Sequence, residues 1–223
     1  MNREDYILFI DSGLSNDGVG FFIGNTFITA GHVINDNLIH TINVNGRKIE
    51  LKKSDAIYLN CAEYDNVSPD IPDVAIFEFK EINSPLILAN DSPTEGQFLE
   101  FISKRRVVEN NEVNGIPSIF TQSEIIKTLF CKGEVKEHDM YYWECHTDKI
   151  LRKGDSGSPV MKGNFVYGVL VGGKPGTPKC VFLSAERIMK IINSVIHTKR
   201  SQELVGQITP ILSDSEILNQ YGE

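Results

Sequence analysis

Hydrophobic residues in the N-terminal part of the chain recur in short runs, apolar or alternating, with turn-forming residues between them. Such runs are typical of β-strands rather than helices. Asn45-Gly46, between two of the runs, is a strong signal for a two-residue hairpin. Together the runs predict one small barrel of short strands. The predicted strands are Tyr6–Ile10, Val19–Ile23, Thr26–Ala30, His40–Val44, Lys48–Leu51, Ala56–Leu59 and Val74–Phe79.

A looser stretch, Lys80–Gly96, follows and contains Pro85 and Pro93, which favour turns and loops. We interpret it as the crossover to a second set of strands. The second set comprises Gln97–Ile102, Ile116–Thr121, Ile125–Gly133, Met140–His146, Ser158–Met161, Phe165–Val171 and Lys179–Leu183.

One helix is predicted after the last strand. Ser184 is a suitable N-cap, and apolar residues then recur at helical spacing from Ile188 to Ile196. The pattern divides the chain into an N-terminal barrel over residues 1–85, a C-terminal barrel with its helix over 86–197, and a tail over 198–223. Apolar residues in the tail suit either a cover for a barrel edge or a contact with a partner.

The segment Gly154–Pro159 has the character of a nucleophile loop. Gly154 and Gly157 permit a tight turn around Ser156, because glycine adopts backbone angles that other residues resist. Such a turn can aim the N–H groups of Gly154 and Ser156 at one point, as an oxyanion hole requires. Ser158 is expected to pack rather than to react.

Two further motifs supply the partners that a serine nucleophile needs. His32 ends a β-like run, and Asp73 opens the apolar strand that follows Pro72. Histidine takes the serine proton, and aspartate fixes the tautomer of the histidine. The order His, Asp, Ser is one of the known chain orders for such a triad.

Each triad position has a structural alternative. His32 can be a strand-end histidine and Asp73 a polar strand cap, while Asp65 and Asp70 are nearby candidates that open no apolar strand. The remaining histidines have no comparable context and are interpreted as surface or packing residues; they are His40, His138, His146 and His197.

These motifs, over about residues 6–197, resemble the trypsin/chymotrypsin-like serine proteases. The resemblance implies an all-β fold of two six-stranded antiparallel β-barrels with a C-terminal α-helix. It implies a serine endopeptidase that forms an acyl-enzyme on Ser156. The alternative is a catalytically silent or partner-activated protease-fold interaction module. Within the family, the Thr147-Asp148 spacing is similar to the Deg/HtrA branch, without a PDZ domain, and Asp155–Pro159 to glutamyl endopeptidases.

Asp155 sets the chain apart from many zymogen proteases. There, the equivalent aspartate pairs with an N-terminal amine that cleavage releases, but here no basic residue precedes an Ile-Val-Gly-Gly start. Either a side chain or backbone group pairs with Asp155, or something else orders the oxyanion loop.

The resemblance also locates a substrate pocket. Its floor falls at Ile150 and Leu151, and its wall is formed by Leu170, Val171, Gly172 and Gly173, with Phe182 at the back. These apolar or small residues imply a small to medium apolar P1 residue. If Asp148 enters the pocket instead, Lys or Arg is selected. Arg152 and Lys153 border the site and are expected to be solvated; the alternative is a contact with an acidic substrate segment.

Composition bears on the partners, the location and the cofactors of the protein. A net charge of −8 does not indicate the basic surface that binds nucleic acid or an anionic membrane. The sequence shows no transmembrane run and no secretory signal, so we expect a cytoplasmic protein. Its cysteines, Cys61, Cys131, Cys145 and Cys180, show no metal-ligand spacing. We expect reduced thiols, with Cys131 and Cys145 the closest pair, no metal and no cofactor. The expected partners are a protein or peptide substrate and, in the alternative, an activating protein.

Overall fold

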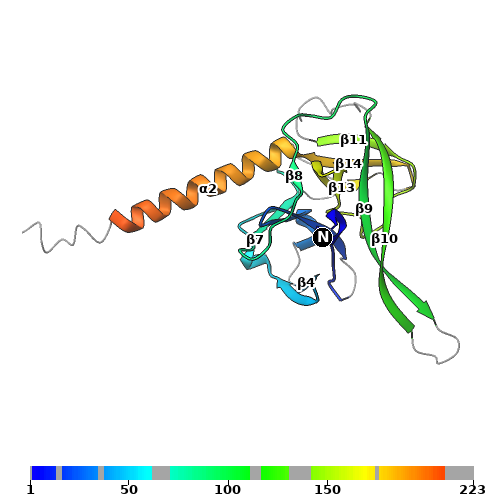
Figure 1. Cartoon of the computed structure of the whole chain (residues 1–223), viewed down its shortest axis with the longest axis horizontal. Helices are drawn as coiled ribbons and strands as arrows, with labels where there is room; N and C mark the ends of the chain where they lie inside the picture. Colours follow the sequence, from blue (N-terminus) through cyan, green and yellow to red (C-terminus); the bar gives the residue numbers. More distant parts are fainter. Residues whose placement is uncertain are drawn as a thin grey trace, which may run out of the picture. The chain divides into compact units, whose positions relative to one another are not determined.

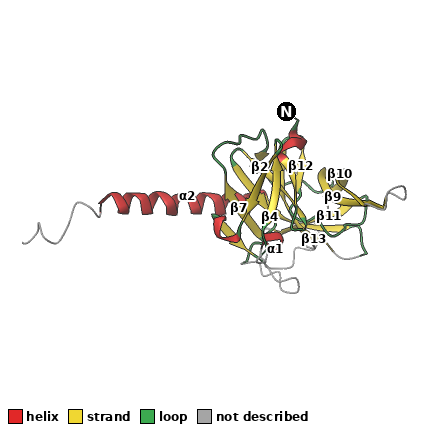
Figure 2. Ribbon diagram, turned by 90° about the horizontal axis from the view of Figure 1, so that it is seen from below, coloured by secondary structure: helices red, strands yellow, loops and turns green. Residues whose placement is uncertain are grey.

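The computed structural model describes residues 2–13, 17–34, 38–61, 71–110, 117–130, 142–173 and 176–208. The chain divides into two compact units, Met1–Ile188 and Met189–Glu223. Antiparallel strands dominate the first unit (Figure 2), and they form two main sheets and a hairpin. The expectation of an all-β molecule is therefore confirmed.

The first sheet has the strand order β1-β2-β3-β7-β6, with every neighbouring pair antiparallel. A bridge between Asp11 and Thr41 joins β4 to β1, and β5 forms a hairpin with β4. The hairpin turn has positive φ at Asn45 (52°) and Gly46 (82°), as a type I′ turn requires. The strands are β1 (Ile7–Ile10), β2 (Gly18–Ile23), β3 (Thr26–Thr29), β4 (His40–Val44), β5 (Arg47–Leu51), β6 (Tyr58–Asn60) and β7 (Val74–Glu78).

Short helical turns precede the first strand and connect later ones. They are η1 (Arg3–Tyr6), α1 (Gly31–Ile34) and η2 (Lys53–Asp55). The core enclosed by the first set of strands is rich in aromatic side chains. Phe22 and Phe27 pack with ring centroids 4.9 Å apart, and Phe79 meets the Phe22 ring edge-on. Each fully buried side chain of this size contributes about 1.5–3 kcal/mol to stability.

The second sheet closes on itself. Its order is β12-β9-β10-β11-β14-β13, and β12 pairs with both β9 and β13 to complete a ring of six strands. A short strand, β8, lies parallel to β13. The bounds are β8 (Ile87–Leu88), β9 (Phe98–Asn110), β10 (Pro117–Phe130), β11 (Tyr142–Thr147), β12 (Pro159–Lys162), β13 (Phe165–Gly173) and β14 (Lys179–Ser184).

The β9–β10 pair differs from the predicted pattern. Figure 1 shows it as a long ribbon that continues past the rest of the sheet. Over their described residues, the two runs predicted over Ile116–Thr121 and Ile125–Gly133 belong to the single strand β10, while 116 and 131–133 lie outside the described residues. The polar residues Gln122, Ser123 and Glu124 look like a break in the sequence, but they stay in register opposite β9. Backbone pairing needs no apolar side chain, so a polar stretch does not end a paired ribbon.

The C-terminal helix α2 spans Ala185–Ile208. Its N-cap is the predicted one, because the Arg187 N–H donates to Ser184 Oγ at 3.3 Å. The helix continues beyond residue 197, where the sequence pattern placed the start of a tail. Residues 209–223 lie outside the described residues. Within the described part of the chain, no helix combines the length and the apolarity that a membrane crossing requires.

Candidate active site

His32 and Asp73 are brought together by neighbouring strands. His32 lies on α1, directly after β3, and Asp73 directly precedes β7, which pairs with β3. The His32 backbone N–H donates to Asp73 Oδ1 at 2.8 Å, and His32 Nδ1 lies 2.6 Å from Asp73 Oδ2. The side chains are 20% and 7% exposed. Two contacts to one carboxylate fix both the position and the ring orientation of this histidine.

Gly31 makes this close approach possible. A Cβ at this position would lie 1.8 Å from the Asn60 carbonyl oxygen and 2.9 Å from Asp73 Oδ1. Any other residue here would push α1 away from the end of β6 and from the carboxylate. The glycine before His32 is therefore required for packing.

Tyr142 of β11 contacts Asp73 from the second set of strands. Its hydroxyl accepts a hydrogen bond from the Asp73 N–H at 2.9 Å and donates to the Ile71 carbonyl at 3.2 Å. The backbone of the aspartate is thus held by the second sheet. Sequence analysis missed this residue, because a lone tyrosine in a predicted strand carries no signal of such a role.

The Ser156 loop consists of two consecutive β-turns. The first is closed by the Asp155 N–H and the Arg152 carbonyl, and the second by the Ser158 N–H and the Asp155 carbonyl, each at 3.2 Å. Gly154 (φ 95°) and Gly157 (φ 86°) are the third residues of these turns. A positive φ at that position is the signature of type II turns and favours glycine. The positive φ angles of the two turns are enough to explain why glycine stands at both positions.

The loop lies against the strands that lead to His32. The Val19 N–H donates to the Ser156 carbonyl at 2.9 Å. A Cβ on Gly157 would lie 1.9 Å from the Val19 carbonyl oxygen and 2.4 Å from Thr29 Oγ1. Thr29 ends β3, just before α1. The loop and the His32–Asp73 pair therefore lie at the same end of β3.

Gly18 lies between the loop and α1. A Cβ at Gly18 would lie 2.7 Å from a methyl group of Val33 and 3.2 Å from the Ser156 carbonyl oxygen. Val33 follows His32 in the chain, so the carbonyl of Ser156 and the residue next to His32 border the same small space.

Asp155 has a cationic partner. Its carboxylate, 2% exposed, accepts hydrogen bonds from Arg105 Nε at 3.0 Å and Nη2 at 3.2 Å. It also accepts from Ser103 Oγ at 2.5 Å and from the Arg152 N–H at 2.8 Å. Asp155 therefore pairs with a side chain, which is one of the two alternatives that the sequence left open. Arg105 was not predicted as a site residue, because the hydrophobic pattern ends this strand at Ile102, whereas β9 continues to Asn110.

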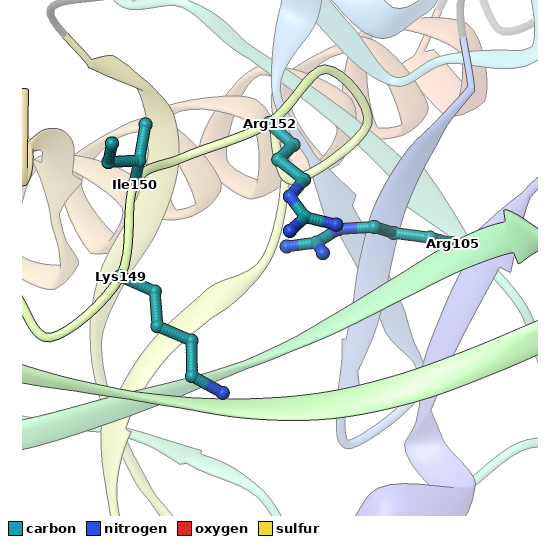
Figure 3. Close-up of a pocket in the computed structure, with 4 residues that line it drawn as sticks. All are labelled: Arg105, Lys149, Ile150 and Arg152. Carbon is teal, nitrogen blue, oxygen red and sulfur yellow. The ribbon is translucent and has the colours of Figure 1, made fainter. Parts of the chain in front are cut away.

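The expected substrate-pocket residues differ widely in their exposure. Leu151, Val171, Gly172 and Gly173 are partly buried. A Cβ on Gly173 would lie 2.3 Å from Leu151 Cδ1, so these two residues are in close contact. Leu170 is 1% exposed and packs in the core with Phe182, which leaves it no surface for a ligand. Ile150 is 53% exposed and, among the described residues, lines a cavity with Arg105, Lys149 and Arg152 (Figure 3).

Two cysteines meet on β11 and β14. Cys145 and Cys180 are directly opposite in the antiparallel register, and both are buried free thiols. The hydrogen bond with Cys145, followed by burial, raises the pKa of the Cys180 thiol well above its ordinary value. The expected neighbour of Cys145 was Cys131, which lies outside the described residues. Among the residues that are described, no cluster of three or more His, Cys, Asp or Glu side chains is arranged to bind a metal ion.

The fold is shared with solved serine proteases. An inactive form of Rv3671c from M. tuberculosis H37Rv, with serine mutated to alanine, is 18% identical, covers 88% of this chain and 89% of its own, and has a TM-score of 0.56. Neuropsin from mouse brain is 15% identical, with 88% and 96% covered and a TM-score of 0.59. Kallikrein-related peptidase 10 in complex with Zn²⁺ is 16% identical, with 87% and 96% covered and a TM-score of 0.54.

No protein-family model and no curated protein matches the sequence. The similarity to these solved structures shows that the chain has the chymotrypsin-like serine protease fold. The fold that the three motifs implied, mostly β-sheet with a C-terminal helix, is confirmed.

Proposed function

We propose that this protein is a serine endopeptidase in which Ser156 is the nucleophile, His32 the general base and Asp73 the residue that orients the histidine. The observation that carries the proposal is the double contact between His32 and Asp73, with the Ser156 loop packed at the same end of β3. The protease-like fold gives this arrangement a natural context.

The mechanism follows from the proton positions that the contact favours. The Nδ1–H of His32 donates to Asp73 Oδ2, which leaves Nε2 to accept the Ser156 proton. Ser156 Oγ then bonds to the peptide carbonyl carbon, and the oxyanion is held by the N–H groups of Gly154 and Ser156. His32 passes the proton to the leaving amine as the C–N bond breaks. Water, deprotonated by His32, then hydrolyses the acyl-enzyme and frees Ser156.

We further propose that the P1 residue is small to medium and apolar. The support is the partly buried surface of Leu151, Val171, Gly172 and Gly173, which carries no charged side chain. The partner of this surface is a protein or peptide substrate. The free thiols of Cys145 and Cys180 suit a reducing compartment such as the cytoplasm, which we propose as the location.

Cleavage of a diverse peptide library tests the function. The full chain should release products after apolar residues, and Ser156→Ala should release none. Ser54→Ala, which removes an exposed hydroxyl elsewhere on the surface, is the matched control and should cleave like the parent. Equal cleavage by the Ser156→Ala protein rules out the assignment. Folded wild-type protein that cleaves nothing supports the alternative, a silent or partner-activated interaction module.

A further inference from the structure

Arg106, on β9, contacts both ends of the connection between β1 and β2. Its Nη2 donates to Asp17 Oδ1 at 3.2 Å and to Asp11 Oδ1, and its Nη1 donates to the Gly13 carbonyl at 3.3 Å. Its guanidinium carbon lies 5.9 Å from the centroid of the Phe9 ring, within cation–π range. The Arg106 and Asp17 side chains are 22% and 23% exposed, so water screens their ion pair only in part.

The two carboxylates also bind the connection itself. Asp17 Oδ1 accepts hydrogen bonds from the N–H and the hydroxyl of Ser12, each at 3.2 Å. Asp11 Oδ1 accepts a hydrogen bond from the Gly13 N–H at 2.7 Å. A guanidinium that bridges two carboxylates makes charge-assisted contacts in a fixed geometry, which the point charge of a lysine cannot reproduce. Arg106 therefore fixes the place where the chain enters β2.

The entry to β2 packs against the Ser156 loop. A Cβ on Gly154 would lie 3.8 Å from the Asp17 carbonyl oxygen, and a Cβ on Gly18 would lie 3.2 Å from the Ser156 carbonyl oxygen. The next residue, Val19, donates its N–H to that same carbonyl at 2.9 Å. A shift of the β2 entry must therefore move the Ser156 backbone with it or break this hydrogen bond.

The β2 entry also packs against the turn that carries the proposed base. A Cβ on Gly18 would lie 2.7 Å from a methyl group of Val33, which follows His32 on α1. The β2 entry thus lies between the Ser156 backbone and α1, and its position sets their separation. A general base must lie within hydrogen-bond reach of its nucleophile, and a small misplacement lowers the rate.

Arg106 and its neighbour Arg105 contact two different segments of the site. Successive residues of a strand point to opposite faces, so the two side chains leave β9 in opposite directions. Arg105 pairs with Asp155 in the Ser156 loop and lies beside Arg152 (Figure 3). Arg106 pairs with the segment against which that loop packs. One strand of the second sheet therefore holds both the loop and its neighbour in the first sheet.

We propose that Arg106 is a positioning residue for the reaction at Ser156. Through Asp17 and Asp11, it holds the β2 entry at the place where Ser156 and His32 are aligned for proton transfer. The proposal rests on the proposed function for its chemistry, but the effect of Arg106 on the β2 entry can be measured without cleavage.

Steady-state peptide cleavage tests the positioning role. Arg106→Gln should lower kcat about tenfold, because the nucleophile and the base lose their alignment. KM should stay within about twofold, because the surface proposed for the P1 residue belongs to Leu151 and residues 171–173. Arg106→Lys keeps the charge but not the fork, and should recover part of kcat.

A double-mutant cycle and a matched arginine separate this role from general stability. Asp17→Asn should also lower kcat, and Arg106→Gln/Asp17→Asn should lower it no further than the worse single variant, because both changes remove one interaction. Arg3 on η1 is 23% exposed and forms an ion pair with Glu100 of β9 at 2.5 Å. Arg3→Gln therefore removes a comparable ion pair to the same strand and should keep the kcat of the parent.

Amide hydrogen exchange measured by NMR gives a readout that needs no activity. The Val19 N–H donates to the Ser156 carbonyl, so its exchange reports the contact between the β2 entry and the loop. It should exchange at least about tenfold faster in Arg106→Gln than in the parent. In Arg3→Gln the exchange rate of the same amide should be unchanged.

An unchanged kcat in Arg106→Gln overturns the proposal, as does an unchanged exchange rate at Val19. An equal loss of kcat in Arg3→Gln also overturns it, because the loss then reflects the stability of the fold. Losses that multiply in the double variant show that Arg106 does not act through Asp17. The failure of the proposed function gives a different result: the parent cleaves no peptide, while exchange at Val19 still rises in Arg106→Gln and not in Arg3→Gln.

Discussion

At the residue scale, the polar side chains of the site are held by partners that leave little freedom. His32 is bound through both its backbone and its ring to Asp73, whose own backbone N–H is bound by Tyr142. The Asp155 carboxylate is held by its ion pair with Arg105. The chemistry that we propose therefore depends on a few specific contacts, each of which can be removed alone.

Replacing Asp73 by Asn tests the orienting role. The amide keeps the size of the side chain, but it cannot stabilise an imidazolium and favours the wrong tautomer of His32. We expect kcat for peptide cleavage to fall by roughly 10⁴, the effect of the same change in the well-studied triad. Asp91→Asn, at an exposed position in the crossover, is the control. A variant within tenfold of the parent would exclude Asp73 from the triad.

Arg105 pairs with the carboxylate next to Ser156, and we expect this ion pair to position the Ser156 loop. Arg105→Gln leaves the buried Asp155 without its cation, which should destabilise the protein by about 3 kcal/mol. Loss of an ordered oxyanion hole should lower kcat by roughly 10². Arg105→Lys restores the charge and should recover part of kcat, which a purely structural loss does not predict. Arg47→Gln, an exposed arginine, serves as the control. An unchanged kcat in Arg105→Gln would show that the ion pair does not order the loop.

At the element scale, the apolar and alternating runs located most strands, because the short strands bury apolar side chains on one face or, as in β2 and β7, on both. The hydrophobic pattern did not predict strand residues that are held in the sheet only by backbone pairing. These are the polar middle of β10 and the extension of β9 that carries Arg105. The short strand β8 was also missed, since Ile87–Leu88 offers too few residues for any periodicity. The residues that we propose as the triad were recognisable from their motifs, whereas Tyr142 and Arg105 became visible only through three-dimensional contacts.

Tyr142 tests the link between β11 and the aspartate. Tyr142→Phe keeps the ring but removes the hydroxyl, so the Asp73 N–H and the Ile71 carbonyl lose their partner. Unfolding in urea should show a loss of about 1–3 kcal/mol, and kcat should fall by more than KM changes. Tyr167→Phe, a half-buried tyrosine on β13, is the matched control. If the two variants behave alike, the hydroxyl of Tyr142 has no special role.

At the scale of the whole molecule, the site depends on both sheets of the unit Met1–Ile188. The first sheet supplies His32 and Asp73, and the second supplies Tyr142 and the strands that flank the Ser156 loop. The proposed activity therefore requires a stable second sheet. Its core contains the Cys145–Cys180 pair, which gives that stability a pH dependence.

The raised pKa of the Cys180 thiol sets the direction of this dependence. The folded protein retains the thiol proton to a higher pH than the unfolded chain does. The stabilisation is therefore complete below the unfolded thiol pKa, about 8.5, and is lost as the pH rises toward the folded value. Urea titrations should show an unfolding free energy that decreases above about pH 8.5, and less steeply in Cys180→Ala. Identical slopes in the two proteins would contradict this.

The central claim, that Ser156 is an activated nucleophile, is tested most directly by mass spectrometry after reaction with a fluorophosphonate. We predict a single phosphonyl adduct on the full chain, mapped to the peptide that contains Ser156. The adduct should be absent from Ser156→Ala and should form far more slowly in His32→Ala, because the serine has then lost its base. An adduct on another residue, or no adduct on a folded protein, would contradict the account.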